Sequence, residues 1–199
     1  MEKHLTWAEV DLNAYAHNIT ELRRIADSGA RLMAVVKANG YGHGAVEVSR
    51  EALGKGAEYL GVARIDEAVQ LREAGLGGPV LIFGYTPPDL AESLFKYDLT
   101  QTVYSIETAN ILSDLAGRQG KKHSVHIKVD SGMGRLGLVL NEAAASRPSA
   151  QQYPDPVQEV LSISRLPGLV VEGIFTHFAT ADSAEKSYAR QQLEKFQEF

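Results

Sequence analysis

The sequence contains no cysteine among its 199 residues. Disulfide bonds and thiolate metal sites are therefore excluded as sources of stability or function. No apolar run is long enough to span a membrane, and residues 1–7 lack the apolar core of a signal peptide. No group of His, Asp and Glu residues has the spacing of metal ligands. These absences make the cytoplasm the expected location and predict neither a metal site nor contact with a membrane.

Basic residues are in the minority, because 20 Lys and Arg against 25 Asp and Glu give a net charge of −5. The sequence has no basic patch, so nucleic acid is not an expected partner. Apolar residues make up 44% of the chain, which is typical of a globular protein. The length allows one large domain or two small ones.

Short apolar or β-branched runs alternate with amphipathic stretches along most of the chain. The runs predict six strands, at 31–36, 58–63, 79–83, 100–104, 124–129 and 169–176. The stretches between them predict helices at 45–53, 65–74, 88–96, 106–118 and 156–164. Further helices are predicted at 14–26 and 184–199, a short separate strand at 7–12, and an exposed connector at 141–155.

This alternation predicts parallel strands that are joined by right-handed crossovers. Two architectures are compatible with it, a doubly wound open sheet and a (βα)8 barrel. The Gly-x-Gly-x-x-Gly fingerprint of dinucleotide-binding proteins follows none of the six runs, which weakens the dinucleotide interpretation. Acidic pairs on the predicted helices, such as Asp66-Glu67, are interpreted as solvated faces.

Lys37 is the first candidate functional residue, because it follows an apolar run and precedes Gly40, Gly42 and Gly44. Burial lowers the pKa of a lysine, and a neutral amine can form a Schiff base with a carbonyl. Glycines permit positive φ angles and let a ligand approach the backbone closely. An amine beside a glycine-rich turn would suit pyridoxal phosphate (PLP), which has both an aldehyde and a phosphate, although a lone lysine after a strand is more often a solvated loop residue.

Two further segments contain candidate residues. In the first, 125–137, strand alternation places Lys128 and Asp130 on one face, and Arg135 on the following glycine-rich loop could bind a carboxylate with its planar guanidinium. In the second, 173–182, His177 ends the last apolar run. A lone histidine in such a place is more often structural than catalytic.

Together with 34–44, these segments resemble the signatures of bacterial alanine racemases and occur in the same order. The resemblance extends from about residue 7 to residue 182. It implies a (βα)8 TIM-type barrel, truncated here to about six βα units, with PLP as the cofactor and a small amino acid as the substrate. It also implies interconversion of L- and D-alanine, with D-alanine supplied for peptidoglycan, and a homodimer.

The resemblance assigns a role to each candidate residue. Lys37 would hold PLP as a Schiff base and then act as the base on the D-alanine side of the substrate. Tyr41 would bind the cofactor phosphate, and His177 would lie beside the pyridine ring. Arg135 would lie near the cofactor and bind the substrate carboxylate, and Lys128 would be carbamylated, as it often is in the family.

The resemblance also implies that 1–199 is an incomplete PLP-binding barrel domain. The last two barrel strands, the arginine that faces the pyridine nitrogen, the tyrosine donated by the partner subunit and the C-terminal β domain have no counterpart in the sequence. We therefore expect the isolated chain to be weakly active or inactive. The alternatives are a racemase of another amino acid such as serine or lysine, a non-catalytic PLP-binding barrel protein, and a chain that binds nothing. The Gly-Met-Gly-Arg loop at 132–135 disfavours the non-catalytic barrel.

Overall fold

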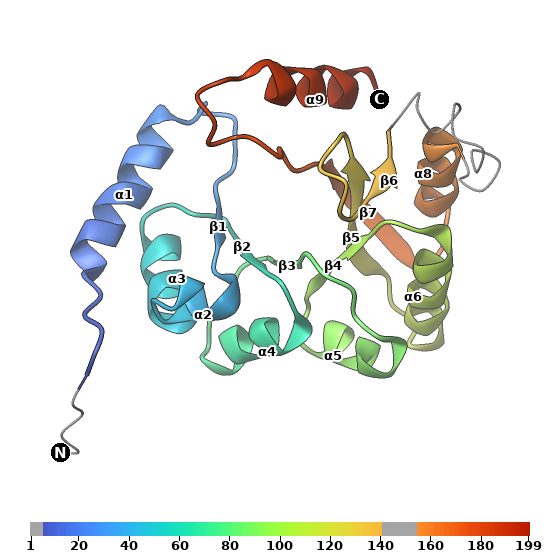
Figure 1. The fold of residues 1–199 in the computed structure, drawn as a ribbon. Coiled ribbons are helices and arrows are strands. Elements are labelled where there is room, and N and C mark those ends of the chain that lie inside the picture. The colour runs from blue at the N-terminus through green and yellow to red at the C-terminus, as the bar shows by residue number, and fades with distance from the viewer. Residues whose placement is uncertain (1–5, 141–154) are drawn as a thin grey trace. The chain divides into compact units, whose positions relative to one another are not determined.

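The computed structural model describes residues 6–140 and 155–199 (Figure 1). The chain divides into two compact units, an N-terminal unit of residues 1–84 and a C-terminal unit of residues 85–199. Among the described residues, no helix combines the length and the apolar character needed to cross a membrane. Residues 141–154 of the predicted connector lie outside the described ranges.

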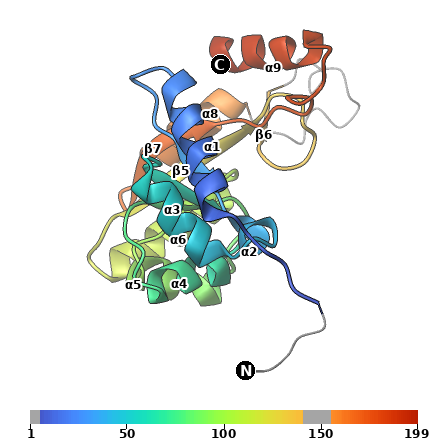
Figure 2. The ribbon, with the colours of Figure 1, turned by 90° about the vertical axis from the view of Figure 1, so that its left-hand side faces the viewer.

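The N-terminal unit is a three-stranded parallel sheet with helices. Its elements are α1 (Leu12–Ile25), β1 (Met33–Val35), α2 (Lys37–Tyr41), α3 (Ala45–Gly54), β2 (Tyr59–Val62), α4 (Ile65–Glu73) and β3 (Val80–Ile82). The central strand β2 pairs in parallel with both neighbours, so that Gly61 lies opposite Val35 on β1 and Leu81 on β3. Helices α1 and α3 pack side by side, as Figures 1 and 2 show. The first three predicted strands and their parallel order are therefore confirmed.

The predicted strand at 7–12 is wrong, because α1 begins at Leu12 and the residues before it form no strand. The Asp11 carboxylate accepts hydrogen bonds from the backbone N–H groups of Asn13 at 2.9 Å and Ala14 at 3.1 Å. An aspartate at this position satisfies donors that the helix itself leaves unpaired. The N-cap therefore moves the start of the helix ahead of the predicted residue 14.

The C-terminal unit also combines parallel strands with helices. Its elements are the 3-10 turn η1 (Pro88–Leu90), α5 (Ala91–Lys96), β4 (Thr100–Val103), α6 (Ile106–Arg118), β5 (His123–Asp130), β6 (Leu138–Val139), α8 (Pro156–Ser164), β7 (Leu169–Phe175) and α9 (Ser187–Glu198). Strand β5 pairs in parallel with β4, β6 and β7. The short strand β6 was not predicted, since two residues are too few to show a pattern.

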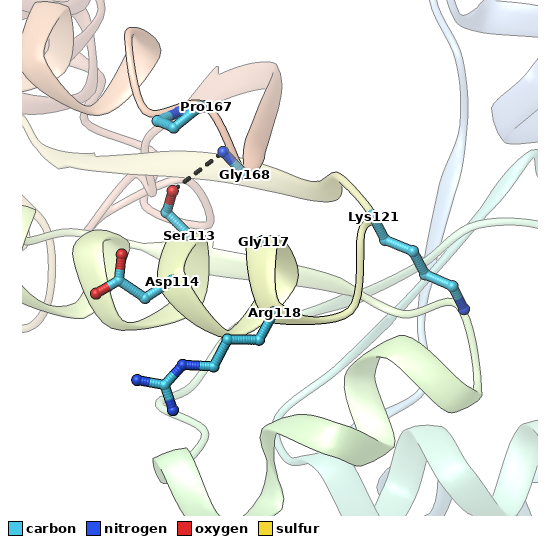
Figure 3. Close-up of a pocket in the computed structure, with 7 residues that line it drawn as sticks. All are labelled: Ser113, Asp114, Gly117, Arg118, Lys121, Pro167 and Gly168. Carbon is cyan, nitrogen blue, oxygen red and sulfur yellow. Dashed lines mark hydrogen bonds between the residues drawn. The ribbon is translucent and has the colours of Figure 1, made fainter.

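Helix α6 and the residue before β7 approach each other closely in this unit (Figure 3). The Gly168 N–H donates to Ser113 Oγ at 3.1 Å, and a Cβ added at Gly168 would overlap the Ser113 carbonyl oxygen. A shallow hollow of about 460 Å³ lies here, also lined by Asp114, Arg118 and Lys121. These charged side chains point in different directions in Figure 3, so they do not converge on a ligand site.

His123, at the start of β5, is a buried neutral base that makes stability depend on pH. Its side chain is 5% exposed, and its ring meets the Phe95 ring edge-on at 4.9 Å between centroids. Burial lowers the pKa of His123 from 6.5 to about 4. Between these two pH values the unfolded chain binds more protons than the folded chain, so stability falls as pH falls through this window.

We expect this histidine to remove about 2–3 kcal/mol of unfolding free energy between pH 7 and pH 4. The measurement is urea unfolding at several pH values for the wild type, for His123→Leu and for a control, His17→Leu, on the exposed face of α1. The His123→Leu protein should show a shallower pH dependence than the other two. Equal pH dependence in all three proteins would show that His123 contributes nothing to it.

Candidate functional site

Residues 38–41 form a left-handed helical turn at the end of β1. The φ angles are 52° at Ala38, 54° at Asn39, 62° at Gly40 and 55° at Tyr41. The sequence predicted a glycine-rich turn, but three of these residues are not glycine. Each L-residue with a side chain costs about 1–2 kcal/mol in this conformation. The surrounding structure must therefore hold the turn in place.

Two side chains hold this turn by accepting backbone hydrogen bonds. Glu67, on α4, accepts the Ala38 N–H at 2.7 Å. Asn39 accepts the Ala45 N–H at 2.9 Å, which also satisfies the first donor of α3. The interpretation of Asp66-Glu67 as a solvated pair is thus wrong for Glu67, whose carboxylate binds main chain that is distant in sequence.

The turn places an amine and a phenol close together. Lys37 Nζ lies 5.8 Å from the centroid of the Tyr41 ring. Lys37 is partly buried, whereas Tyr41 is 59% exposed. A hollow of about 520 Å³ adjoins the turn and is lined by Lys37, Arg64 and Glu67 among others, whereas Tyr41 lines a different hollow. The size of the first hollow is in the range of small-molecule sites.

This donor set suits a ligand with a carbonyl and a phosphate. A primary amine can bond to a carbonyl carbon. A phenol hydroxyl can donate a hydrogen bond to a phosphate oxygen. An alanine Cβ built at Gly42, where φ is 87°, would meet nothing within 4 Å, so open space adjoins the backbone there. The residues of the N-terminal unit therefore fit the cofactor that the sequence predicts.

In the C-terminal unit, Asp130 organises the loop that contains Arg135. Its Oδ1 accepts the N–H groups of Gly132 at 2.9 Å and Gly134 at 3.0 Å. Its Oδ2 accepts the Arg135 N–H at 3.1 Å. Asp130 is 7% exposed, while the Arg135 side chain is exposed. The buried carboxylate thus fixes the backbone of the loop and leaves the guanidinium accessible.

The end of β7 lies beside this loop. Ser131 Oγ and Thr176 Oγ1 are hydrogen-bonded at 2.8 Å. Gln192, on α9, donates from Nε2 to the His177 carbonyl oxygen at 3.1 Å and accepts the Ala179 N–H at 2.8 Å. The structure therefore brings the loop of Arg135 and the segment of His177 together. Gln192 of α9 contacts both of them, through Ser131 and through the His177 carbonyl.

Lys128 is the most buried of the predicted site residues, with 4% exposure. Its Nζ lies 5.4 Å from the centroid of the Phe175 ring, on the neighbouring strand β7. The register pairs the same two residues across the sheet. The His177 side chain, two residues beyond the end of β7, is exposed.

Glu67 and Gln192 are the side chains that sequence reasoning missed. A glutamate at the third position of a helix is one half of a capping box, and the other half is usually a serine or threonine at the N-cap. The N-cap residue of α4 is Arg64, so the usual Ser/Thr-x-x-Glu pattern is absent from the sequence. Gln192 lies on a polar helix and yet is 1% exposed. Nothing in its local sequence indicated the burial.

Comparison with known proteins identifies relatives over the whole chain. Residues 10–199 match the family model described as alanine racemase, N-terminal domain. An alanine racemase of Methanococcus maripaludis is 44% identical over 100% of this chain and 50% of that protein. One from Desulfosudis oleivorans is 46% identical over 98% of this chain and 49% of that protein. The chain thus spans about half the length of the curated relatives it matches.

Solved structures give the same result for the fold. The crystal structure of the alanine racemase from Bacillus anthracis with bound L-Ala-P superimposes with a TM-score of 0.84 and 36% identity, covering 100% of this chain and 48% of that one. The enzyme of Clostridium difficile 630 gives 0.80 and 37%, covering 92% of this chain and 45% of that one. The predicted fold class, the α/β fold of this barrel domain with about six βα units, is confirmed.

Proposed function

The chain belongs to the alanine racemase family, and from this premise we propose that it serves the PLP-dependent interconversion of L- and D-alanine. The observation that supports the proposal most directly is the turn after β1, where Lys37 Nζ lies 5.8 Å from the Tyr41 ring. The proposal treats residues 1–199 as a PLP-binding domain, in keeping with the family model's match over 10–199.

In the N-terminal unit, Lys37 and Tyr41 would hold the cofactor. Lys37 Nζ would bond to its carbonyl carbon and Tyr41 would donate to a phosphate oxygen. Bound PLP withdraws electrons from the substrate Cα. Once released from the cofactor, the Lys37 amine would take a proton from Cα, or return one, on the D-alanine side.

In the C-terminal unit, Arg135 would bind the substrate carboxylate through two parallel hydrogen bonds. His177 would lie beside the cofactor ring. Carbamylation would convert the buried Lys128 into an anion that can pair with Arg135. The exposed guanidinium on a loop fixed by Asp130 supports the first of these roles.

The proposal includes the wider role of the family, the supply of D-alanine for peptidoglycan by a homodimer. The alternative functions are a racemase of serine or lysine and a non-catalytic PLP-binding barrel protein. The relatives named alanine racemase favour alanine over other substrates. The Arg135 loop favours an enzyme over a cofactor carrier.

The experiment is exchange of the Cα hydrogen in heavy water, because exchange needs a base on only one face of the substrate. The purified chain is loaded with PLP and supplied with D-alanine, D-serine or D-lysine, whose Cα hydrogen lies on the Lys37 side, and deuterium at Cα is followed by NMR while L-isomers are measured by chiral chromatography. We expect faster exchange in D-alanine than in D-serine or D-lysine, with slower or no formation of L-alanine by the chain alone. Exchange faster in serine or lysine would reassign the substrate, and no exchange in any of them would favour a non-catalytic carrier.

A further inference from the structure

The Glu67 carboxylate links the ends of two neighbouring strands. Its Oε1 accepts the Ala38 N–H at 2.7 Å, just after β1. Its Oε2 accepts the N–H groups of Ala63 at 2.7 Å and Arg64 at 3.1 Å, just after β2. The three donors belong to loops at the carboxyl ends of parallel strands, where the active sites of barrel enzymes are built.

These contacts exceed what is needed to cap α4. Capping requires only the bond from the Arg64 N–H to the third residue of the helix. The bond to Ala38 joins residues 29 positions apart and ends on the first residue of the left-handed turn. A carboxylate suits this place because it offers two acceptor oxygens and no donor, whereas a glutamine would turn an NH2 group toward an N–H.

Ala38 follows Lys37 directly, so the peptide between them is fixed by Glu67. On the other side of Lys37, the Val36 N–H donates to the Gly61 carbonyl oxygen at 2.8 Å. Lys37 therefore lies between two backbone N–H groups that are both held, one by the Gly61 carbonyl of β2 and the other by the Glu67 carboxylate of α4. The flexible four-carbon side chain of Lys37 can point in a defined direction only if the backbone that carries it is held in place.

We infer that Glu67 is a positioning residue, which fixes the strained turn so that the Lys37 amine faces the cofactor carbonyl. The inference rests on the proposed function for the reaction itself. Glu67 lies outside the three segments that resemble the family signatures, and its side chain would touch no reacting atom.

The test compares Glu67→Gln and Glu67→Ala with Asp66→Asn. Asp66 lies on the same turn of α4, where its exposed carboxylate pairs with the exposed Arg64 side chain. Two readouts are taken from each protein: exchange of the Ala38 amide hydrogen without cofactor, and pyridoxyl label on Lys37 after incubation with PLP and reduction with borohydride. Lys55, an exposed lysine of the same unit, serves as the internal reference for labelling.

We expect both Glu67 variants to exchange the Ala38 amide faster by about tenfold or more, the scale set by one hydrogen bond to a charged acceptor. Label on Lys37 should fall relative to Lys55, while Asp66→Asn behaves like the wild type in both readouts. A Glu67→Asp variant, which keeps the carboxylate, should recover part of the label.

Folded Glu67 variants with wild-type exchange at Ala38 would overturn the inference. Faster exchange with unchanged labelling of Lys37 would also overturn it, because Glu67 would then be only a structural cap. If the wild type itself takes no label on Lys37, the proposed function fails, and the amide exchange still decides whether Glu67 holds the turn.

Discussion

Replacing Lys37 with methionine is expected to abolish borohydride-fixed pyridoxyl label at position 37. Methionine keeps an unbranched side chain of similar length but has no amine, so no covalent bond to a cofactor carbonyl can form. The left-handed turn should persist, because its known supports, Glu67 and Asn39, act through the backbone of other residues. The measurement is peptide mapping by mass spectrometry after reduction, together with circular dichroism to confirm folding.

Two controls sharpen this result. Lys55→Met removes another lysine of the N-terminal unit and should leave the label on Lys37 unchanged. Lys121→Met removes an exposed lysine of the C-terminal unit, and it should also leave that label in place. Label that moves to other lysines without preference would show that the wild type reacts non-specifically with the aldehyde.

Gly168→Ala is expected to lower the unfolding free energy by about 3–5 kcal/mol or to prevent folding. The added methyl would overlap the Ser113 carbonyl oxygen, which belongs to the main chain of α6. Gly168 cannot easily move, since its N–H donates to Ser113 Oγ at 3.1 Å and its carbonyl accepts the His123 N–H at 2.9 Å.

The matched control for this variant is Gly117→Ala, which alters another glycine at the same hollow (Figure 3). A Cβ at Gly117 meets nothing within 4 Å, and the residue lies inside α6. Alanine should therefore stabilise the protein by up to about 1 kcal/mol. The unfolding free energies of both variants are measured by urea unfolding. If the two substitutions change the unfolding free energy by a similar amount in the same direction, the contact at Gly168 is not tight.

The sequence predicted the elements whose causes are local. The amphipathic pattern predicted a helix at 156–164, and α8 has those bounds. The same holds for 106–118 and α6, which Ser105 caps at its start. The predicted helix at 88–96 begins instead with a 3-10 turn before α5.

The sequence could not predict features that depend on distant partners. The handedness of the turn after Lys37 depends on an acceptor that lies 29 residues further on. Gln192 is buried because of donors and acceptors on the segment after β7, which no pattern within α9 indicates. The candidate residues were found from their motifs, whereas the side chains that hold them were found only in three dimensions.

The backbone at position 38 has a consequence for chemical synthesis. With φ of 52° and ψ of 50°, Ala38 adopts the mirror image of the ordinary helical conformation, which is the one that a D-amino acid prefers. A semisynthetic chain with D-alanine at this single position would be relieved of about 1–2 kcal/mol of strain. Glycine would relieve the same strain, but it would also give the unfolded chain more freedom, which offsets part of the gain. The turn that presents Lys37 would thus accept D-alanine at position 38 with less strain than the natural L-residue.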